Sequence, residues 1–313
     1  MIDNNVGYES YTYKCGKVLY SKDKQSIYSN NGLVVEKSLL EQKDFSDTEG
    51  LVVMGDYKLE NYAITGNYEY LNIKSGEIAH IGRLHNIIYI YLECNQVFLA
   101  SKSEIWCFDL DRGKEVWCYS LSTLGNYLSV SNEEKPHTVK AFLGSFNGLL
   151  VIQLANATIL FLDIMSGQVS KILHVNTQCP LPQGVFYDDA FSPHIIDGQL
   201  IWLNNQRLLK VDLEDYEIKV IKNYYDEPKD KQFRFMHNSY FGDKIYFVAD
   251  YGWQYVTPSR IGVMDYATGE VICNKKLEKT GGLPEPPKVM TNKLYIRTAK
   301  GDLYVFDKSD QPA

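Results

Sequence analysis

Short runs of alternating apolar and polar residues recur along this chain, and each run ends in the same kind of turn. A run closes with an apolar residue and an Asp or Asn, followed by turn-forming residues that often include Gly. The best copy runs from Ile105 to Trp117. The Asp or Asn side chain can accept hydrogen bonds from the next backbone amides, and Gly supplies a positive φ that other residues resist. The motif therefore predicts a tight hairpin between two strands.

The motif repeats along the whole chain. Its Asp or Asn lies at 72, 109, 163, 212, 265 and 307 in the clear copies, and at about 30 in a weak copy over residues 27–33. These intervals of 37 to 54 residues match a four-stranded propeller blade and are too long for a leucine-rich or ankyrin repeat. Another strand is predicted upstream in five copies, at residues 97–100, 149–152, 200–203, 245–248 and 294–297. No window has the 3.6-residue stripe of a helix, so almost no long helix is expected.

These patterns predict an all-β fold, a single β-propeller of seven blades with four antiparallel strands each, within a range of six to eight blades. The blades are expected at about residues 8–40, 41–83, 84–122, 123–176, 177–222, 223–278 and 279–313. The repeat ends after the third strand of the last blade. We expect a segment within residues 2–12 to supply the missing outer strand, because a closed ring protects strand edges from aggregation. A three-stranded last blade is the alternative.

The repeat resembles the PQQ-like (quinoprotein-type) propeller repeat, whose hallmark is a hairpin of the form LYALDxxTGxxxW. Residues 264–271 and 108–117 carry the resemblance most clearly, and it extends over about residues 8–310. The resemblance implies the scaffold and not the PQQ chemistry. Quinoprotein dehydrogenases with this repeat are typically eight-bladed, exported and longer, and some have adjacent cysteines beside the cofactor, which this sequence lacks. A WD40 propeller is disfavoured because the Gly-His and Trp-Asp pairing is missing.

Composition narrows the possible partners and the location. The net charge of −7 and the absence of a long basic run disfavour nucleic acid and anionic membranes as partners. The 24 Tyr, against 13 Phe and 4 Trp, suit strand surfaces and also a recognition surface. The sequence has no signal-peptide pattern, no apolar stretch of membrane-spanning length and six scattered Cys without a CxxC pair. A reducing, cytoplasmic location is therefore expected.

The longest connections are expected on one face of the propeller. If strands alternate in direction, the loops between blades share an edge with the loops that join the second and third strands of a blade. Loops on one face of a repeat array usually carry binding. The long loops are residues 123–137, 177–193, 223–236 and 279–287 between blades, and 250–259 within the sixth blade.

These loops are rich in aromatic and acidic residues. Aromatic side chains can act as anchors and carboxylates as steering charges toward a basic protein. Packing of the aromatic rings beneath the loops is the alternative interpretation. The candidate partner-binding residues are Tyr187, Asp188, Asp189, Tyr225, Asp226, Tyr251, Trp253, Tyr255 and His237.

Catalytic, metal and cofactor motifs are missing from the sequence. Asp188 and Asp189 are adjacent on an extended chain and would point in opposite directions, and the repeated Asp anchors are interpreted as turn residues. The six His form no HxH or HExxH pattern, although His194 and His237, placed just before inner strands, could line a channel mouth. No GxSxG elbow or phosphate-binding Gly loop occurs. We therefore expect no catalytic residue, no metal and no cofactor.

Two functions follow as hypotheses. The first is a non-enzymatic propeller that binds a protein, such as a bacterial immunity-type or regulatory protein that caps a basic partner with its acidic, aromatic loop face. The alternative is an enzyme that acts on a small molecule or sugar at the mouth of the central channel, a place where propellers often bind ligands.

Overall fold

The computed structural model describes residues 10–14, 17–21, 26–29, 32–36, 50–60, 63–72, 78–85, 87, 89–93, 96–109, 112–129, 131–182, 187, 191–228, 231–251, 258–278 and 280–308. Side chains are described from Ile87 onward, apart from residues 90 and 92. The chain divides into two compact units, residues 1–155 with 160–171 and residues 156–159 with 172–313. Each unit is considered by itself below.

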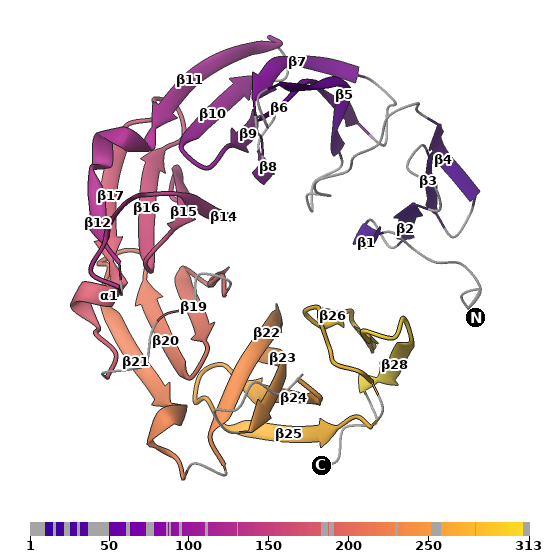
Figure 1. Ribbon diagram of the computed structural model, residues 1–313, viewed down its shortest axis with the longest axis vertical. Helices are drawn as coiled ribbons and strands as arrows, with labels where there is room; N and C mark the ends of the chain where they lie inside the picture. Colours follow the sequence, from indigo (N-terminus) through magenta and orange to yellow (C-terminus); the bar gives the residue numbers. More distant parts are fainter. Residues whose placement is uncertain are drawn as a thin grey trace. The chain divides into compact units, whose positions relative to one another are not determined.

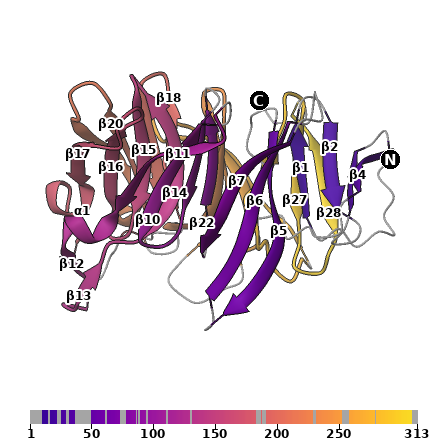
Figure 2. The same cartoon turned by 90° about the horizontal axis from the view of Figure 1, so that it is seen from above.

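The first unit is built from antiparallel sheets whose strands follow one another in chain order (Figure 1). A four-stranded sheet contains β1 (Ser10–Lys14), β2 (Lys17–Ser21), β3 (Ser26–Ser29) and β4 (Gly32–Glu36). A three-stranded sheet contains the long strands β5 (Gly50–Glu60) and β6 (Ala63–Asn72) with β7 (Ile78–His85) (Figure 2). The next four-stranded sheet contains β8 (Tyr89–Glu93), β9 (Gln96–Ala100), β10 (Glu104–Asp109) and β11 (Lys114–Ser120).

Two further elements complete this part of the chain. A small hairpin of β12 (Asn126–Leu128) and β13 (Glu134–Pro136) lies inside the long 123–137 connection, where the sequence predicted only a loop. A four-stranded sheet then contains β14 (Val139–Phe146), β15 (Leu149–Leu154), β16 (Thr158–Asp163) and β17 (Val169–His174), and its last two strands include residues of both units.

The second unit repeats the same construction. One four-stranded sheet contains β18 (His194–Ile196), β19 (Gln199–Asn204), β20 (Arg207–Asp212) and β21 (Ile218–Asn223). Another contains β22 (Phe233–Phe241), β23 (Lys244–Tyr251), β24 (Arg260–Asp265) and β25 (Val271–Lys276). A three-stranded sheet contains β26 (Lys288–Val289), β27 (Lys293–Arg297) and β28 (Leu303–Asp307).

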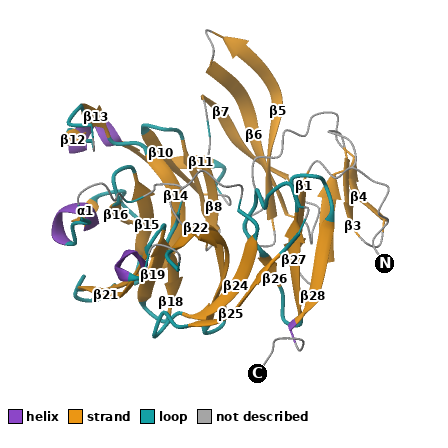
Figure 3. Cartoon of the chain, turned by 60° about the horizontal axis from the view of Figure 1, so that its bottom comes forward, coloured by secondary structure: helices purple, strands orange, loops and turns teal. Residues whose placement is uncertain are grey.

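The observed elements confirm the all-β prediction and the strand positions on which it rested. The five strands expected upstream of the turns are β9, β15, β19, β23 and β27. The helical elements of two or more described residues are η1 (Leu121–Leu124), α1 (Val175–Gln178) and η2 (Tyr224–Asp226), all of them short (Figure 3). Two sheets have three described strands instead of the four expected. The number of blades and their closure into one ring stay predictions.

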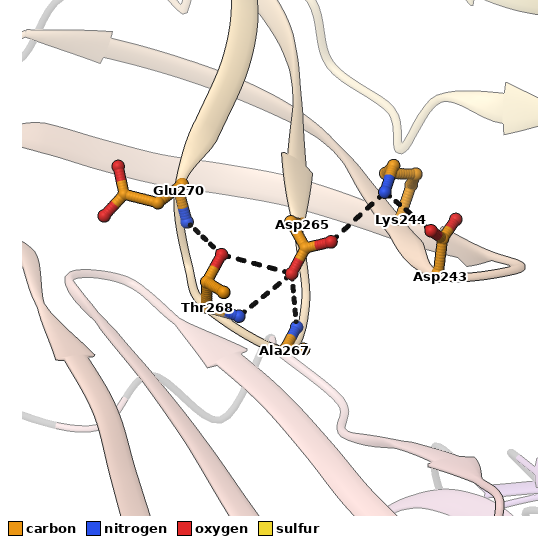
Figure 4. A network of polar contacts seen from close by, with 6 residues as sticks. All are labelled: Asp243, Lys244, Asp265, Ala267, Thr268 and Glu270. Atoms are coloured by element: carbon orange, nitrogen blue, oxygen red, sulfur yellow. Dashed lines mark hydrogen bonds and ion pairs between the residues drawn. The ribbon is translucent and has the colours of Figure 1, made fainter.

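Four of the repeated aspartates, at 109, 163, 212 and 265, lie at the turns between third and fourth strands, as predicted, whereas the residues after Lys308 lie outside the described residues. Between β24 and β25, Asp265 Oδ1 accepts hydrogen bonds from the backbone N–H groups of Ala267 and Thr268, both at 2.9 Å, and from the Thr268 hydroxyl at 3.1 Å (Figure 4). Gly269, at φ +71°, donates its N–H to the Asp265 carbonyl oxygen at 2.9 Å. One carboxylate and one left-handed residue therefore satisfy the polar groups of the turn.

One copy of the turn forms without Gly. Tyr216 stands four residues after Asp212, where the copies that begin at Asp109, Asp163 and Asp265 have Gly, and it adopts φ +63°. A left-handed conformation costs a non-Gly residue about 1–2 kcal/mol. The turn keeps two of the hydrogen bonds seen in the other copies: Asp212 Oδ1 accepts from the Glu214 N–H at 2.8 Å, and the Asp212 N–H donates to the Glu217 carbonyl at 3.0 Å. The backbone conformation is thus set by the hairpin as a whole.

Outer strands dock aromatic side chains on the turn of the following sheet. In the first unit, Trp117 of β11 donates its Nε1–H to the Ile164 carbonyl at 2.8 Å. A Cβ on Gly167 would lie 2.6 Å from Trp117 Cδ2, so only a glycine fits beneath the indole ring. In the second unit, the Tyr224 hydroxyl, just after β21, donates to the Gly269 carbonyl at 2.7 Å. The same turn therefore closes its own hairpin and receives the preceding sheet.

The Asp265 turn predicts a specific response to acid. Burial acts to raise the pKa of Asp265, but hydrogen bonds from Thr268 and the ion pair with Lys244 (Nζ–Oδ2 3.2 Å) outweigh it and hold the pKa below its ordinary value of 3.8. Because the pKa is lower in the folded state, this stabilisation is present above the unfolded pKa and is lost as pH falls through the folded pKa. When the pH is lowered below about 4, the free energy of unfolding should therefore fall less in Asp265→Asn than in wild type. Urea unfolding at a series of pH values measures this difference.

The control for this experiment is Asp243→Asn. Asp243 Oδ2 lies 2.7 Å from Lys244 Nζ and is the second carboxylate on that lysine (Figure 4). This change removes a carboxylate from Lys244 without touching the turn amides and should keep the wild-type acid response. Identical acid responses in Asp265→Asn and wild type would contradict the assignment.

Candidate partner-binding site in the long loops

The long loops of the second unit begin at the sheet edge predicted for them. Arg207, the first residue of β20, pairs with Asn223, the last residue of β21. The loop after β21 therefore starts beside the turn between β19 and β20, and the Tyr224 N–H donates to the Gln206 carbonyl at 2.8 Å. The next sheet shows the same arrangement, because the Leu277 N–H donates to the Ser259 carbonyl at 2.8 Å. The two kinds of loop share an edge within each of these sheets.

Two of the candidate residues meet at one buried arginine. Arg207 is 5% exposed, and its Nη1 donates to the Tyr187 hydroxyl oxygen at 3.0 Å while its Nη2 donates to the Tyr225 hydroxyl oxygen. The Tyr225 ring lies 5.4 Å from the guanidinium carbon. Nη1 also reaches the carbonyl oxygens of Cys179 at 3.1 Å and Pro180 at 3.3 Å. None of these acceptors is a carboxylate, and carbonyl and hydroxyl dipoles surround the charge.

The ionisation of this group follows from its surroundings. Burial acts to lower the pKa of Arg207, but hydrogen bonds to Tyr225 and Tyr187 outweigh it and hold the pKa above its ordinary value. Burial raises the pKa of Tyr187, although the hydrogen bond from Arg207 acts in the opposite direction. The cluster therefore places a guanidinium cation beside the neutral phenol of Tyr187.

Tyr187 supports the loop from beneath instead of projecting from it. It is 8% exposed, its hydroxyl donates to the Cys179 carbonyl at 2.7 Å, and its ring lies 5.7 Å from that of Trp202. Trp202 in turn donates its Nε1–H to the Phe191 carbonyl at 2.9 Å. For Tyr187, the alternative of a ring packed beneath the loop describes the observed contacts.

The loop after β21 turns its acidic residues outward. Gln232 is 8% exposed, and its Nε2 donates to the carbonyl oxygens of Tyr225 at 2.8 Å and Glu227 at 2.7 Å. These bonds close the loop over an internal amide. Tyr225 is half-buried, whereas Asp226 and Glu227 are exposed.

A second arginine holds another candidate residue. The Arg260 guanidinium lies 4.3 Å from the centre of the Tyr251 ring, and its Nη1 donates to Asn274 Oδ1 at 2.8 Å. Tyr251 is half-buried and its other neighbour is Phe233, with ring centres 4.7 Å apart. Arg260 Nε lies 3.9 Å from Asp250 Oδ1, so Asp250 and Tyr251, at the start of the 250–259 loop, are held by opposite charges and by ring contacts.

The remaining candidates divide into two groups. His237 is half-buried in the middle of β22, where it pairs with Val248 next to a register shift, and the prediction that it precedes the strand is wrong. The strand begins earlier because Phe233 and Phe235 extend its buried face. Asp188, Asp189, Trp253 and Tyr255 lie outside the described residues.

Sequence reasoning missed the two arginines. Both stand five residues before a turn aspartate, Arg207 before Asp212 and Arg260 before Asp265. Each also donates to an Asn of the outer strand, and each contacts a Tyr: Arg207 donates to the Tyr225 hydroxyl, and Arg260 lies over the ring of Tyr251, the last residue of β23. The signal was available as a repeated Arg at the first position of the third strand, which aligning the copies on their aspartates would have exposed.

The sequence matches no protein-family model and no curated protein. Solved structures match by shape. A computationally designed protein, Ika8, is 12% identical with a TM-score of 0.60, covering 96% of this chain and 83% of its own. BamB from Moraxella catarrhalis, a PQQ-like β-propeller, is 13% identical with a TM-score of 0.51, covering 95% and 96%. Hsv2 from Kluyvelomyces marxianus, also a propeller, is 12% identical with a TM-score of 0.50, covering 81% and 72%.

These likenesses concern the fold alone. They support a propeller scaffold for this all-β chain, in agreement with the expectation from its repeats. In the part of the chain that the structure describes, no helix combines the length and apolar character needed to cross a bilayer.

Proposed function

We propose that this chain binds a protein partner through the long loops of its second unit, with acidic residues outward and tyrosines fixed below them. The observation that carries the proposal is the loop after β21, where Asp226 and Glu227 are exposed while Tyr225 is held by Arg207. Aromatic residues with restricted rotamers lose little entropy when a partner contacts them. Carboxylates around them would attract a basic partner and raise its association rate.

The Arg clusters also support this role. A loop that is ordered before binding does not have to be ordered by the partner, so more of the interaction free energy appears as affinity. Arg207 holds Tyr225, and Arg260 holds Tyr251. Of the carboxylates near these loops, Asp250 lies 3.9 Å from Arg260, whereas the exposed Asp226 and Glu227 do not bond either arginine. Asp226 and Glu227 are left for a partner. The proposed partner presents Lys or Arg side chains.

The proposal predicts that charge reversal on the loop weakens capture of a partner. We expect wild type, used as bait in a lysate of its source cells, to retain a partner in stoichiometric amount, less of it as salt increases. Asp226→Lys with Glu227→Lys should reduce the retained amount at least about tenfold, since interface charge pairs contribute more than about 1.4 kcal/mol.

The matched control changes the same charge at the other end of β21. Glu214→Lys with Glu217→Lys alters exposed residues of the turn before that strand, including an exposed ion pair with Lys219 that contributes little stability. This variant should retain the partner as wild type does. Capture of no stoichiometric partner by wild type, or equal losses in both variants, would count against the proposal.

We also propose that the sheets form one closed seven-bladed propeller of PQQ-like repeats. The support comes from β28, where Leu303 is 38% and Val305 is 48% exposed. Leu303 and Val305 stand four and two residues before Asp307. In the four sheets with described side chains that precede β28, the residues at these two positions are buried and apolar, apart from Lys210. They are Ile105, Cys107, Ile159, Phe161, Leu208, Ile261 and Val263. In a closed ring, the next sheet would cover this face of β28.

The packing of the last two sheets supports this account of the exposed face. Ile261 and Val263 belong to one apolar cluster with Leu294 and Ile296 of the following sheet. The outer strands β11, β17, β21 and β25 each carry Lys, which protects a strand edge, whereas β28 carries none. Residues 10–14 form β1 and pair with β2, so they are already used in another sheet. Within residues 2–12, residues 2–9 are then left to supply the outer strand of the last blade, and they lie outside the described residues.

Closure predicts unequal effects of the same substitution at two valines of similar exposure. Val220 lies in the outer strand β21 and is 40% exposed. We expect Val220→Lys to change the free energy of unfolding by less than about 0.5 kcal/mol, as surface substitutions do. Val305→Lys should cost about 1–3 kcal/mol, because a charge would be placed against a covering sheet. Equal, small effects in urea unfolding would argue against closure over this face.

A further inference from the structure

We propose that Arg207 is a positioning residue that couples two stretches of the long loops: in the first loop, before β18, the residues Cys179, Pro180 and Tyr187, and in the second loop, after β21, residues 224–228. Loss of the contacts in one stretch would weaken those in the other. The purpose of this coupling rests on the proposed partner-binding function, whereas the contacts of Arg207 do not depend on that proposal. One guanidinium bonds both loops. Nη1 serves the first loop through Cys179, Pro180 and Tyr187, and Nη2 serves the second through Tyr225.

The base of the arginine is fixed, so its fork acts as a rigid link. Arg207 pairs with Asn204 of β19 and with Asn223 of β21 in the interior of a four-stranded sheet. Its Nε donates to Asn223 Oδ1 at 2.8 Å, which sets the plane of the guanidinium. With the stem and plane held, Nη1 and Nη2 point in fixed directions toward the two loops.

The burial of the charge makes the two sets of contacts depend on one another. A buried guanidinium that loses an acceptor must be hydrated or left with an unsatisfied donor, and either outcome is costly. If the first loop moves away, water reaches Nη1 and competes for the remaining bonds on the same planar group. The bond to Tyr225 is then weakened, although nothing in the second loop has changed. The reverse holds when Tyr225 leaves first.

Coupling of this kind would serve the proposed surface directly. Tyr225 is followed by the exposed Asp226 and Glu227, and it shares the Arg207 guanidinium with Tyr187. A basic partner that contacts these two acidic residues would meet a tyrosine whose position depends on the contacts of both loops with Arg207.

Hydrogen exchange of the unbound protein tests the coupling with single-atom changes. Tyr187→Phe removes only the phenol oxygen on the first loop, and Tyr225→Phe removes only that on the second. Coupling predicts that each variant accelerates amide exchange in both loops, by about fivefold for the loss of one hydrogen bond, with exchange in β19 and β23 unchanged. Arg207→Lys, which keeps the charge but not the fork, should accelerate both loops together.

Tyr251→Phe is the matched control, because Tyr251 is held by its ring between Phe233 and Arg260 and should affect neither loop. Acceleration confined to the loop that carries each substitution would overturn the proposal, and so would unchanged exchange in Arg207→Lys. The measurement needs no partner. Failure of the coupling would therefore leave the capture experiment standing, and failure to capture a partner would leave the coupling standing.

Discussion

The described structure depends on one repeated contact, in which the turn between third and fourth strands receives an aromatic side chain from the preceding sheet. Trp117 donates to the Ile164 carbonyl and covers Gly167, and Tyr224 donates to the Gly269 carbonyl. The turn has room for this contact because its own polar groups are satisfied internally by an aspartate. Because the carboxylate bonds the amides of its own turn, a carbonyl oxygen and a glycine without a side chain stay accessible to the aromatic residue of the preceding sheet. Each repeat can therefore add one sheet to the next.

The loop edge of the second unit follows from this regularity. The turn edge is short and repetitive because it must fit the preceding sheet, whereas the opposite edge has no such requirement and can carry insertions. The insertions still need anchoring, and the chain supplies it with arginines at the first position of β20 and β24. Each guanidinium donates to an Asn of the outer strand and contacts a Tyr where a long loop meets the sheet, but the Asn and the Tyr stand at different places in the two repeats. The two repeats therefore share the arginine and not the positions of its partners.

The sequence was sufficient for features governed by local chemistry. Asp-Gly turns, the strands that flank them and the edge from which the loops of the second unit leave all follow from short-range pattern, and they are present as expected. Tyr216 was not foreseen in a left-handed conformation, because the hairpin imposes that φ from outside the residue. The sequence left open whether Tyr187 is exposed or packed beneath its loop, because its burial depends on Arg207, twenty residues later in the chain. The hairpin β12–β13 was missed because its residues are mostly exposed and lack an apolar pattern.

The docking contact can be tested most directly by comparing two glycines of one sheet. Gly167 and Gly148 have φ of +69° and +77°, so an added Cβ imposes similar backbone strain of about 1–2 kcal/mol at both. At Gly148 nothing lies within 4 Å of that Cβ, whereas at Gly167 it would lie 2.6 Å from the indole of Trp117. In urea unfolding, Gly167→Ala should lose more stability than Gly148→Ala by about 1–3 kcal/mol, the cost of overpacking. Equal losses would contradict the claim that packing of Trp117 on this turn holds the two neighbouring sheets together.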